Sequence, residues 1–75
     1  MSSGAETEIK LEVRDLRAVR RQVQHLGFRK IQSRHFESNT LYDFDDLRLW
    51  KARCLLRLRH ADRQWLLTFK GAPLE

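Results

Sequence analysis

The chain has 75 residues, of which 15 are basic and 10 are acidic, and its formal net charge is +5. A chain of this length forms at most one domain, and it buries about 60% of the surface that its unfolded state exposes. The single cysteine, Cys54, excludes an internal disulfide, and no apolar segment approaches the ~18 residues of a membrane span. We therefore expect a cytoplasmic domain that neither crosses a membrane nor depends on disulfides.

The positive excess lies in the second part of the chain. Residues 1–46 carry eight basic and eight acidic side chains, whereas from Leu47 onward seven basic side chains face only two acidic ones. Such asymmetry indicates an anionic partner. A phosphorylated small molecule, a nucleic acid and an acidic protein surface all satisfy this criterion, and composition does not choose among them.

The first half predicts one strand and one helix. Residues 6–13 alternate polar and apolar, which is typical of a strand with one buried face. Apolar residues then recur at spacings of three and four across 15–26, where Asp15 is a suitable N-cap and Gly27 a suitable residue to follow the helix.

The second half predicts mostly strands. Residues 28–44 indicate one bent strand or two short ones, and 45–51 indicate a turn or short helix capped by Asp45 or Asp46. Residues 54–60 and 63–70 form two β-like runs that the dipeptide Ala61-Asp62 would join as a hairpin. The predicted fold class is α+β, an antiparallel sheet with one packed helix.

Alternation places charge on one face of this sheet. Glu6, Glu8 and Lys10 share a face of the first strand, and the same face of the later strands carries Arg57, Arg59 and Lys70. A solvated sheet face often has this composition. The set also suits a triphosphate, because arginine can donate to two phosphate oxygens at once and Mg²⁺ takes one or two carboxylates plus phosphate oxygens.

A short signature and four further motifs in order resemble the CYTH domain family, which includes class IV adenylate cyclases and thiamine triphosphatases, the triphosphate tunnel metalloenzymes. The chain opens with Glu6-Thr7-Glu8-Ile9-Lys10, similar to the family's E-x-E-x-K signature, and a helix ends at Leu26-Gly27-Phe28. The stretch 36–43, the run Leu55-Leu56-Arg57-Leu58-Arg59 and the run Leu67-Thr68-Phe69-Lys70-Gly71 follow in order. The resemblance covers residues 6–71.

The resemblance implies a fold, a cofactor and residue roles. Such domains are eight-stranded antiparallel tunnels that bind triphosphates inside, so the charged face would be the lumen, and Ile9, Leu11 and Val13 would pack outward against helices. By analogy Glu6 and Glu8 would hold Mg²⁺ or Mn²⁺. The triphosphate of ATP, thiamine triphosphate or tripolyphosphate would be bound by Lys10, Arg57, Arg59 and Lys70. The implied activity is that of an adenylate cyclase, a lyase, or a triphosphatase, a hydrolase.

Length is where the chain departs from the family. A family domain is about twice as long, so residues 1–75 are expected to form a partial CYTH domain, the N-terminal half of the tunnel. Such a half would be completed by a missing C-terminal half or by a second chain, and alone it would be inactive. A free half-sheet would also be a poor prospect for a stable monomer, because it exposes edge strands and uncompensated charge.

Two other functions remain open. A non-catalytic module for phosphate or polyphosphate would keep the basic residues without turnover. Nucleic acid is disfavoured, because Glu6, Glu8 and Glu12 on the first strand would repel a phosphate backbone. Trp50 and Trp65 could stack on a base, although their apolar neighbours favour packing against the helix.

Overall fold

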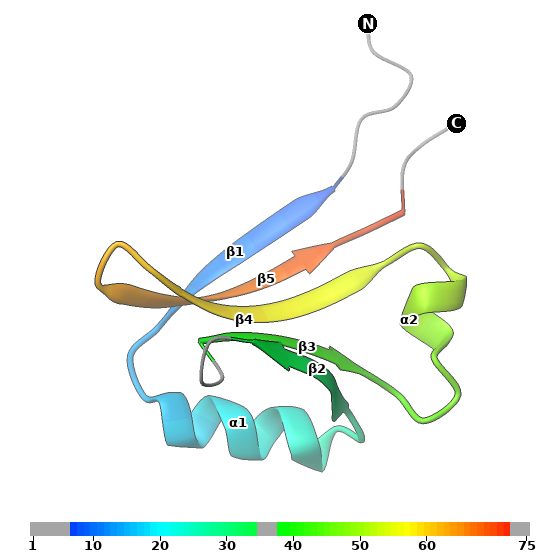
Figure 1. The fold of residues 1–75 in the computed structure, drawn as a ribbon, viewed down its shortest axis with the longest axis horizontal. Helices are drawn as coiled ribbons and strands as arrows, with labels where there is room; N and C mark the ends of the chain where they lie inside the picture. The colour runs from blue at the N-terminus through cyan, green and yellow to red at the C-terminus, as the bar shows by residue number, and fades with distance from the viewer. Residues whose placement is uncertain (1–6, 35–37, 73–75) are drawn as a thin grey trace, which may run out of the picture.

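Five strands and two helices make up the chain in a computed structural model, in which residues 7–34 and 38–72 are described (Figure 1). The elements in chain order are β1 (Glu8–Val13), α1 (Leu16–His25), β2 (Arg29–Arg34), β3 (Asn39–Asp43), α2 (Arg48–Lys51), β4 (Leu55–Ala61) and β5 (Gln64–Lys70). The predicted α+β class is confirmed. No helix within the described residues is long and apolar enough to cross a membrane.

All five strands form one antiparallel sheet in the order β1-β5-β4-β3-β2. The first and last strands of the described chain therefore lie side by side, which Figure 1 shows at the upper side of the sheet. Strands β1 and β2 are the two edges.

Helix α1 begins and ends where the sequence predicts. The Asp15 side chain accepts a hydrogen bond from the Ala18 N–H at 3.1 Å and so satisfies a free donor of the first turn. After Leu26, Gly27 has a φ of 97°, a left-handed conformation that favours glycine and ends the helix.

One face of the sheet is packed against α1. The buried apolar residues are Val13 and Val23 together with Tyr42, Leu56 and Leu58, and Trp65 and Leu67 are among the half-buried residues that pack against them. We call this the helix-covered face. Trp65 lies there as predicted, with the Arg20 guanidinium 5.5 Å from its ring centre.

The outer part of β1 departs from expectation. Val13 is buried, but Ile9 and Leu11 are 51% and 56% exposed. The helix lies at the opposite end of the sheet from the start of β1, as Figure 1 shows, so it does not reach these side chains. The prediction that Trp50 packs against the helix is also wrong. Its side chain is 74% exposed because α2 turns it outward.

Residues 28–44 form two short strands rather than one bent strand. The pairing of β2 with β3 shifts between Lys30 and Gln32, which leaves Ile31 as an extra residue in a β-bulge. A bulge exchanges the faces of all following residues. It therefore places Gln32 and Arg34 on the face opposite α1.

The β4–β5 hairpin turns one residue later than predicted. Ala61 pairs with Gln64, so the two-residue loop is Asp62-Arg63 instead of Ala61-Asp62. Both loop residues have positive φ, 51° and 65°, as a type I′ turn requires. This turn matches the twist of the strands, and that match outweighs the cost of left-handed conformations in two non-glycine residues.

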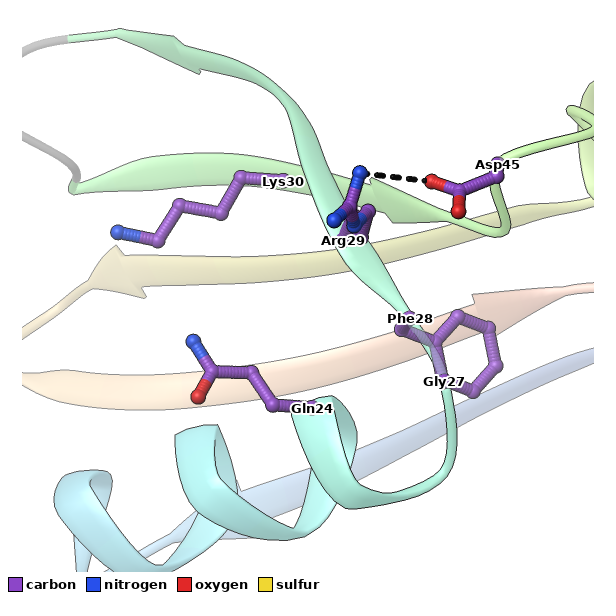
Figure 2. Close-up of a pocket in the computed structure, with 6 residues that line it drawn as sticks. All are labelled: Gln24, Gly27, Phe28, Arg29, Lys30 and Asp45. Carbon is purple, nitrogen blue, oxygen red and sulfur yellow. Dashed lines mark ion pairs between the residues drawn. The ribbon is translucent and has the colours of Figure 1, made fainter.

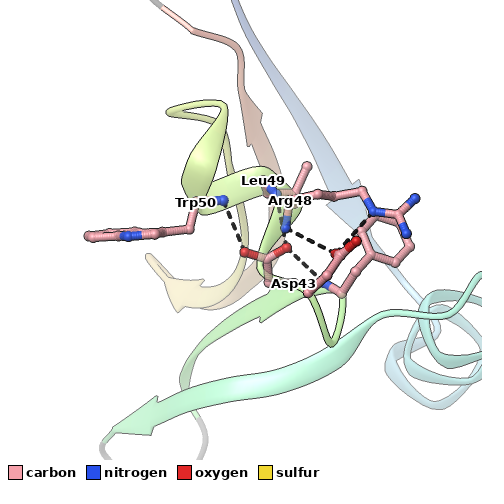
Figure 3. Close-up of polar contacts among 6 residues, drawn as sticks. Asp43, Arg48, Leu49 and Trp50 are labelled. Carbon is pink, nitrogen blue, oxygen red and sulfur yellow. Dashed lines mark hydrogen bonds and ion pairs between the residues drawn. The ribbon is translucent and has the colours of Figure 1, made fainter.

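A buried carboxylate anchors α2 (Figure 3). Asp43 is 1% exposed and accepts hydrogen bonds from the backbone N–H groups of Phe44, Leu49 and Trp50 at 2.7–3.0 Å. The predicted caps act differently: Asp46 accepts from the Arg48 N–H at 3.2 Å, and Asp45 forms an ion pair with Arg29. Asp43 replaces them because the strand end carries it directly beneath the first turn of α2.

Candidate functional site

The strand register gathers charged side chains on the face opposite α1. Glu8 and Leu55 both lie opposite Lys70, Lys10 and Arg57 both lie opposite Thr68, and Glu12 and Arg59 both lie opposite Leu66. Residues paired in this way point to the same side of a sheet. We call the group Glu8, Lys10, Arg57, Arg59 and Lys70 the charged face.

Glu8 lies between the two lysines of the charged face. One carboxylate oxygen is 3.4 Å from Lys10 Nζ and the other is 3.9 Å from Lys70 Nζ. All three side chains are partly exposed, so these contacts stabilise the fold little. Their effect is local: a carboxylate between two ammonium groups balances part of the charge that would repel the lysines from each other.

Arg57 and Arg59 project from the central strand β4. Both side chains are half-buried, and the Nε atom of each is buried without a hydrogen-bond partner among the described residues. Arginine donors bind two oxygens of a phosphate in a planar fork, which lysine cannot do. The charged face therefore combines two point charges at one edge with two forked donors nearer its centre.

The structure adds residues that the sequence reasoning did not assign to the site. Thr68 is fully buried between Lys10 and Arg57 on the charged face. A hollow of about 110 Å³ adjoins Arg57, and it is lined by Gln32, Arg34, Asn39, Leu41 and Arg57. With its amide turned so that the oxygen faces the guanidinium, Gln32 accepts from Arg34 Nη2 and Nε at 2.8 and 2.9 Å. No sequence signal reveals Gln32 and Arg34, because the bulge at Ile31 decides their face.

A larger hollow of about 630 Å³ lies elsewhere, at the end of α1 and the start of β2 (Figure 2). Its lining consists of Gln24, Gly27, Phe28, Arg29, Lys30 and Asp45. The Arg29 guanidinium faces Asp45 at 3.1 Å in an exposed ion pair, which satisfies the charge of both. We place the candidate site on the charged face because its four cations come from three strands and outnumber the two carboxylates of β1 on the same side, Glu8 and Glu12.

Of the two predicted metal ligands, only Glu8 lies within the described residues; Glu6 lies outside them. No group of three His, Cys, Asp or Glu side chains that could hold a metal occurs in 7–34 and 38–72. Mg²⁺ is commonly bound by one or two carboxylates together with substrate phosphates and waters. Glu8 therefore fits a cation that is shared with phosphate oxygens, and the described residues do not form an all-protein metal cage.

Comparison with known proteins identifies the family of the chain. The sequence matches the CYTH domain family over residues 4–75. Searches of curated proteins and of solved structures returned no significant match. Because the family match spans almost the whole chain, the chain belongs to the CYTH domain family.

Proposed function

We propose that the charged face binds the triphosphate group of a substrate together with a divalent cation, and that the chain contributes this surface to a triphosphate-processing enzyme. CYTH domains are triphosphate-binding tunnel proteins and are generally dependent on divalent metals. The observation that carries the proposal is the convergence of Lys10, Lys70, Arg57 and Arg59 beside the Glu8 carboxylate, on the face of the sheet opposite α1.

Each residue has a distinct role in this proposal. Arg57 and Arg59 donate in a fork to non-bridging phosphate oxygens, while Lys10 and Lys70 neutralise the phosphates nearest β1. Glu8 would hold Mg²⁺ or Mn²⁺, with Glu6 as its proposed second ligand. When bound, the divalent cation supplies additional neutralisation of the charge that develops on the phosphate oxygens.

The substrates we propose are ATP, thiamine triphosphate or tripolyphosphate, because the cationic groups recognise phosphates rather than an organic group. In a triphosphatase the residues would orient the terminal phosphate for attack by water. In a cyclase they would hold the triphosphate group so that the ribose 3′-hydroxyl reaches the α-phosphorus and pyrophosphate leaves. We further propose that residues 1–75 form one half of the tunnel, which a C-terminal half or a second chain completes.

The test is Glu8→Gln, with Glu12→Gln as the matched control. Glu12 lies on the same strand and the same side of the sheet but pairs with Leu66 rather than a lysine. Tripolyphosphate binding is measured by titration calorimetry with and without Mg²⁺, and phosphate and cyclic AMP release are measured on the completed domain.

Mg²⁺ should increase the affinity for tripolyphosphate in the wild type. We expect this increase to be at least about tenfold smaller in Glu8→Gln, since one good charge-assisted ligand contributes ~1.5–3 kcal/mol. Metal-free binding should stay the same or tighten, because the Glu8 carboxylate then no longer competes with the phosphates for the two lysines. An equal loss of tripolyphosphate affinity with and without Mg²⁺ would contradict the proposed role of Glu8 as a metal ligand. A completed domain that binds tripolyphosphate but releases no product would indicate the non-catalytic phosphate module instead.

A further inference from the structure

Two neighbouring residues of the charged face, Thr68 and Arg57, each have a buried polar atom without a hydrogen-bond partner among the described residues. Thr68 is 0% exposed, and its hydroxyl has no hydrogen-bond partner among the described residues. Arg57, its direct cross-strand neighbour, has a buried Nε atom in the same condition. Paired residues of this kind have Cβ atoms about 5 Å apart, a separation that the Arg57 side chain can span by rotation to bring its Nε–H to the Thr68 hydroxyl.

The other fully buried threonine shows that this arrangement is not a general property of threonine in this sheet. Thr40 is 1% exposed and lies on the helix-covered side, where its hydroxyl is hydrogen-bonded to Ser33 Oγ at 3.2 Å. Buried hydroxyl groups normally have such a partner. Unpaired buried atoms also occur at Arg20, Tyr42 and Arg59, but none of these has a second unpaired atom directly opposite it on a neighbouring strand.

We propose that Thr68 is a positioning residue that acts through Arg57, an inference that rests on the proposed phosphate-binding function. Its hydroxyl accepts the Nε–H of Arg57 when the guanidinium turns toward a phosphate. Nε–H is only a donor and a threonine hydroxyl can accept, so the two atoms are chemically complementary. The two terminal nitrogens then remain as a fork for two phosphate oxygens.

Burial makes Thr68 a positioning residue and not a direct ligand. The residue has no exposed surface, because Lys10 and Arg57 flank it on the neighbouring strands. A phosphate on the charged face therefore meets those two cations first. The hydrogen bond between Thr68 and Arg57 forms as the guanidinium turns toward the phosphate, so it fixes the bound rotamer of Arg57 and adds to the free energy of binding.

The experiment compares Thr68→Val, Thr68→Ser and Thr40→Val in tripolyphosphate titrations. Thr68→Val keeps the branched shape and removes the hydroxyl, so the dissociation constant should rise about fivefold, the equivalent of one hydrogen bond. Thr68→Ser restores the hydroxyl and should bind within about twofold of the wild type. Thr40→Val removes a buried hydroxyl from the opposite side of the sheet and should leave the dissociation constant unchanged.

A double-mutant cycle identifies the path of the effect. In an Arg57→Ala background, Thr68→Val should have no further effect, because the hydroxyl then has no guanidinium to hold. The Arg57 Nε–H resonance gives a direct readout: tripolyphosphate should slow its exchange with water in the wild type and in Thr68→Ser, but not in Thr68→Val.

The possible failures are distinct. Equal binding by wild type and Thr68→Val, or an undiminished effect of Thr68→Val without Arg57, would overturn the role of Thr68 while leaving the proposed function intact. A wild-type chain, completed by its partner half, that does not bind tripolyphosphate would overturn the proposed function, and this inference with it. Should Thr68→Val unfold, a wild-type dissociation constant for Thr68→Ala with a normal melting temperature would refute the inference equally well.

Discussion

The two faces of the sheet are made by alternate residues of the same strands, yet their contacts are of different kinds. On β4, Leu58 is 0% exposed in the apolar core beneath α1, whereas the adjacent Arg57 lies on the charged face, where its Nε has no partner among the described residues. The apolar side chains of the helix-covered face are close-packed against other residues of the same chain. The second face keeps more cations than carboxylates close together among the described residues, which supports the anionic ligand that we propose for it.

The largest expected effect is on the helix-covered face. Leu58→Ala should lower the free energy of unfolding by about 2–5 kcal/mol, since it removes a fully buried side chain and leaves a cavity. Urea unfolding followed by circular dichroism measures this change. Ile9→Ala is the control on the same side of the sheet, and it should change stability by less than about 0.5 kcal/mol because Ile9 is exposed. Similar losses in both variants would show that the core extends to the start of β1.

Whereas Leu58→Ala should lower stability, Arg57→Ala should weaken tripolyphosphate binding and lower the free energy of unfolding little. Removal of charge-assisted hydrogen bonds worth ~1.5–3 kcal/mol should weaken tripolyphosphate binding roughly tenfold to a hundredfold. Calorimetric titration measures the affinity, with Lys51→Ala on the exposed helix α2 as a control for net charge. An unchanged affinity in Arg57→Ala would mean that phosphates do not bind to this face.

The smallest effect is expected at an ion pair that belongs to neither face. Arg48 Nε donates to Asp46 at 3.1 Å, and this hydrogen bond holds the pKa of Asp46 below its ordinary value. A lowered pKa in the folded state adds stability above the unfolded pKa and loses it as the pH falls through the folded value. Asp46→Asn should therefore be slightly less stable than the wild type at pH 7, and the difference should disappear as the medium is acidified through the folded pKa.

Urea midpoints of the wild type and Asp46→Asn at neutral and acid pH test this expectation. Because the pair is exposed, the difference at neutral pH should be small. A difference that persists in acid would mean that the Asp46 side chain acts through its backbone hydrogen bond to Arg48 rather than through its charge.

Local patterns were sufficient for much of the fold. Strict alternation predicted β1 and the two faces of β4 and β5, because a period of two leaves only one way to bury the apolar side. Asp15 and Gly27 marked the limits of α1, since both act on backbone groups within a few residues of themselves. The same alternation assigned one common side to the charged residues of these strands, namely Glu8, Lys10, Arg57, Arg59 and Lys70.

Contacts between distant residues decided the rest. Asp43 replaced the nearer aspartates as the anchor of α2, because its position at the strand end brings both oxygens to the helix N–H groups. The bulge at Ile31 brought Gln32 and Arg34 to the charged face, and the cross-strand register brought Thr68 beside its neighbour on β4. The sequence by itself determined which residues share a face of the regular strands β1, β4 and β5, because there that depends only on neighbours in the chain. Tertiary structure alone decided which strands are adjacent and in what register, because pairing depends on packing between segments far apart in sequence.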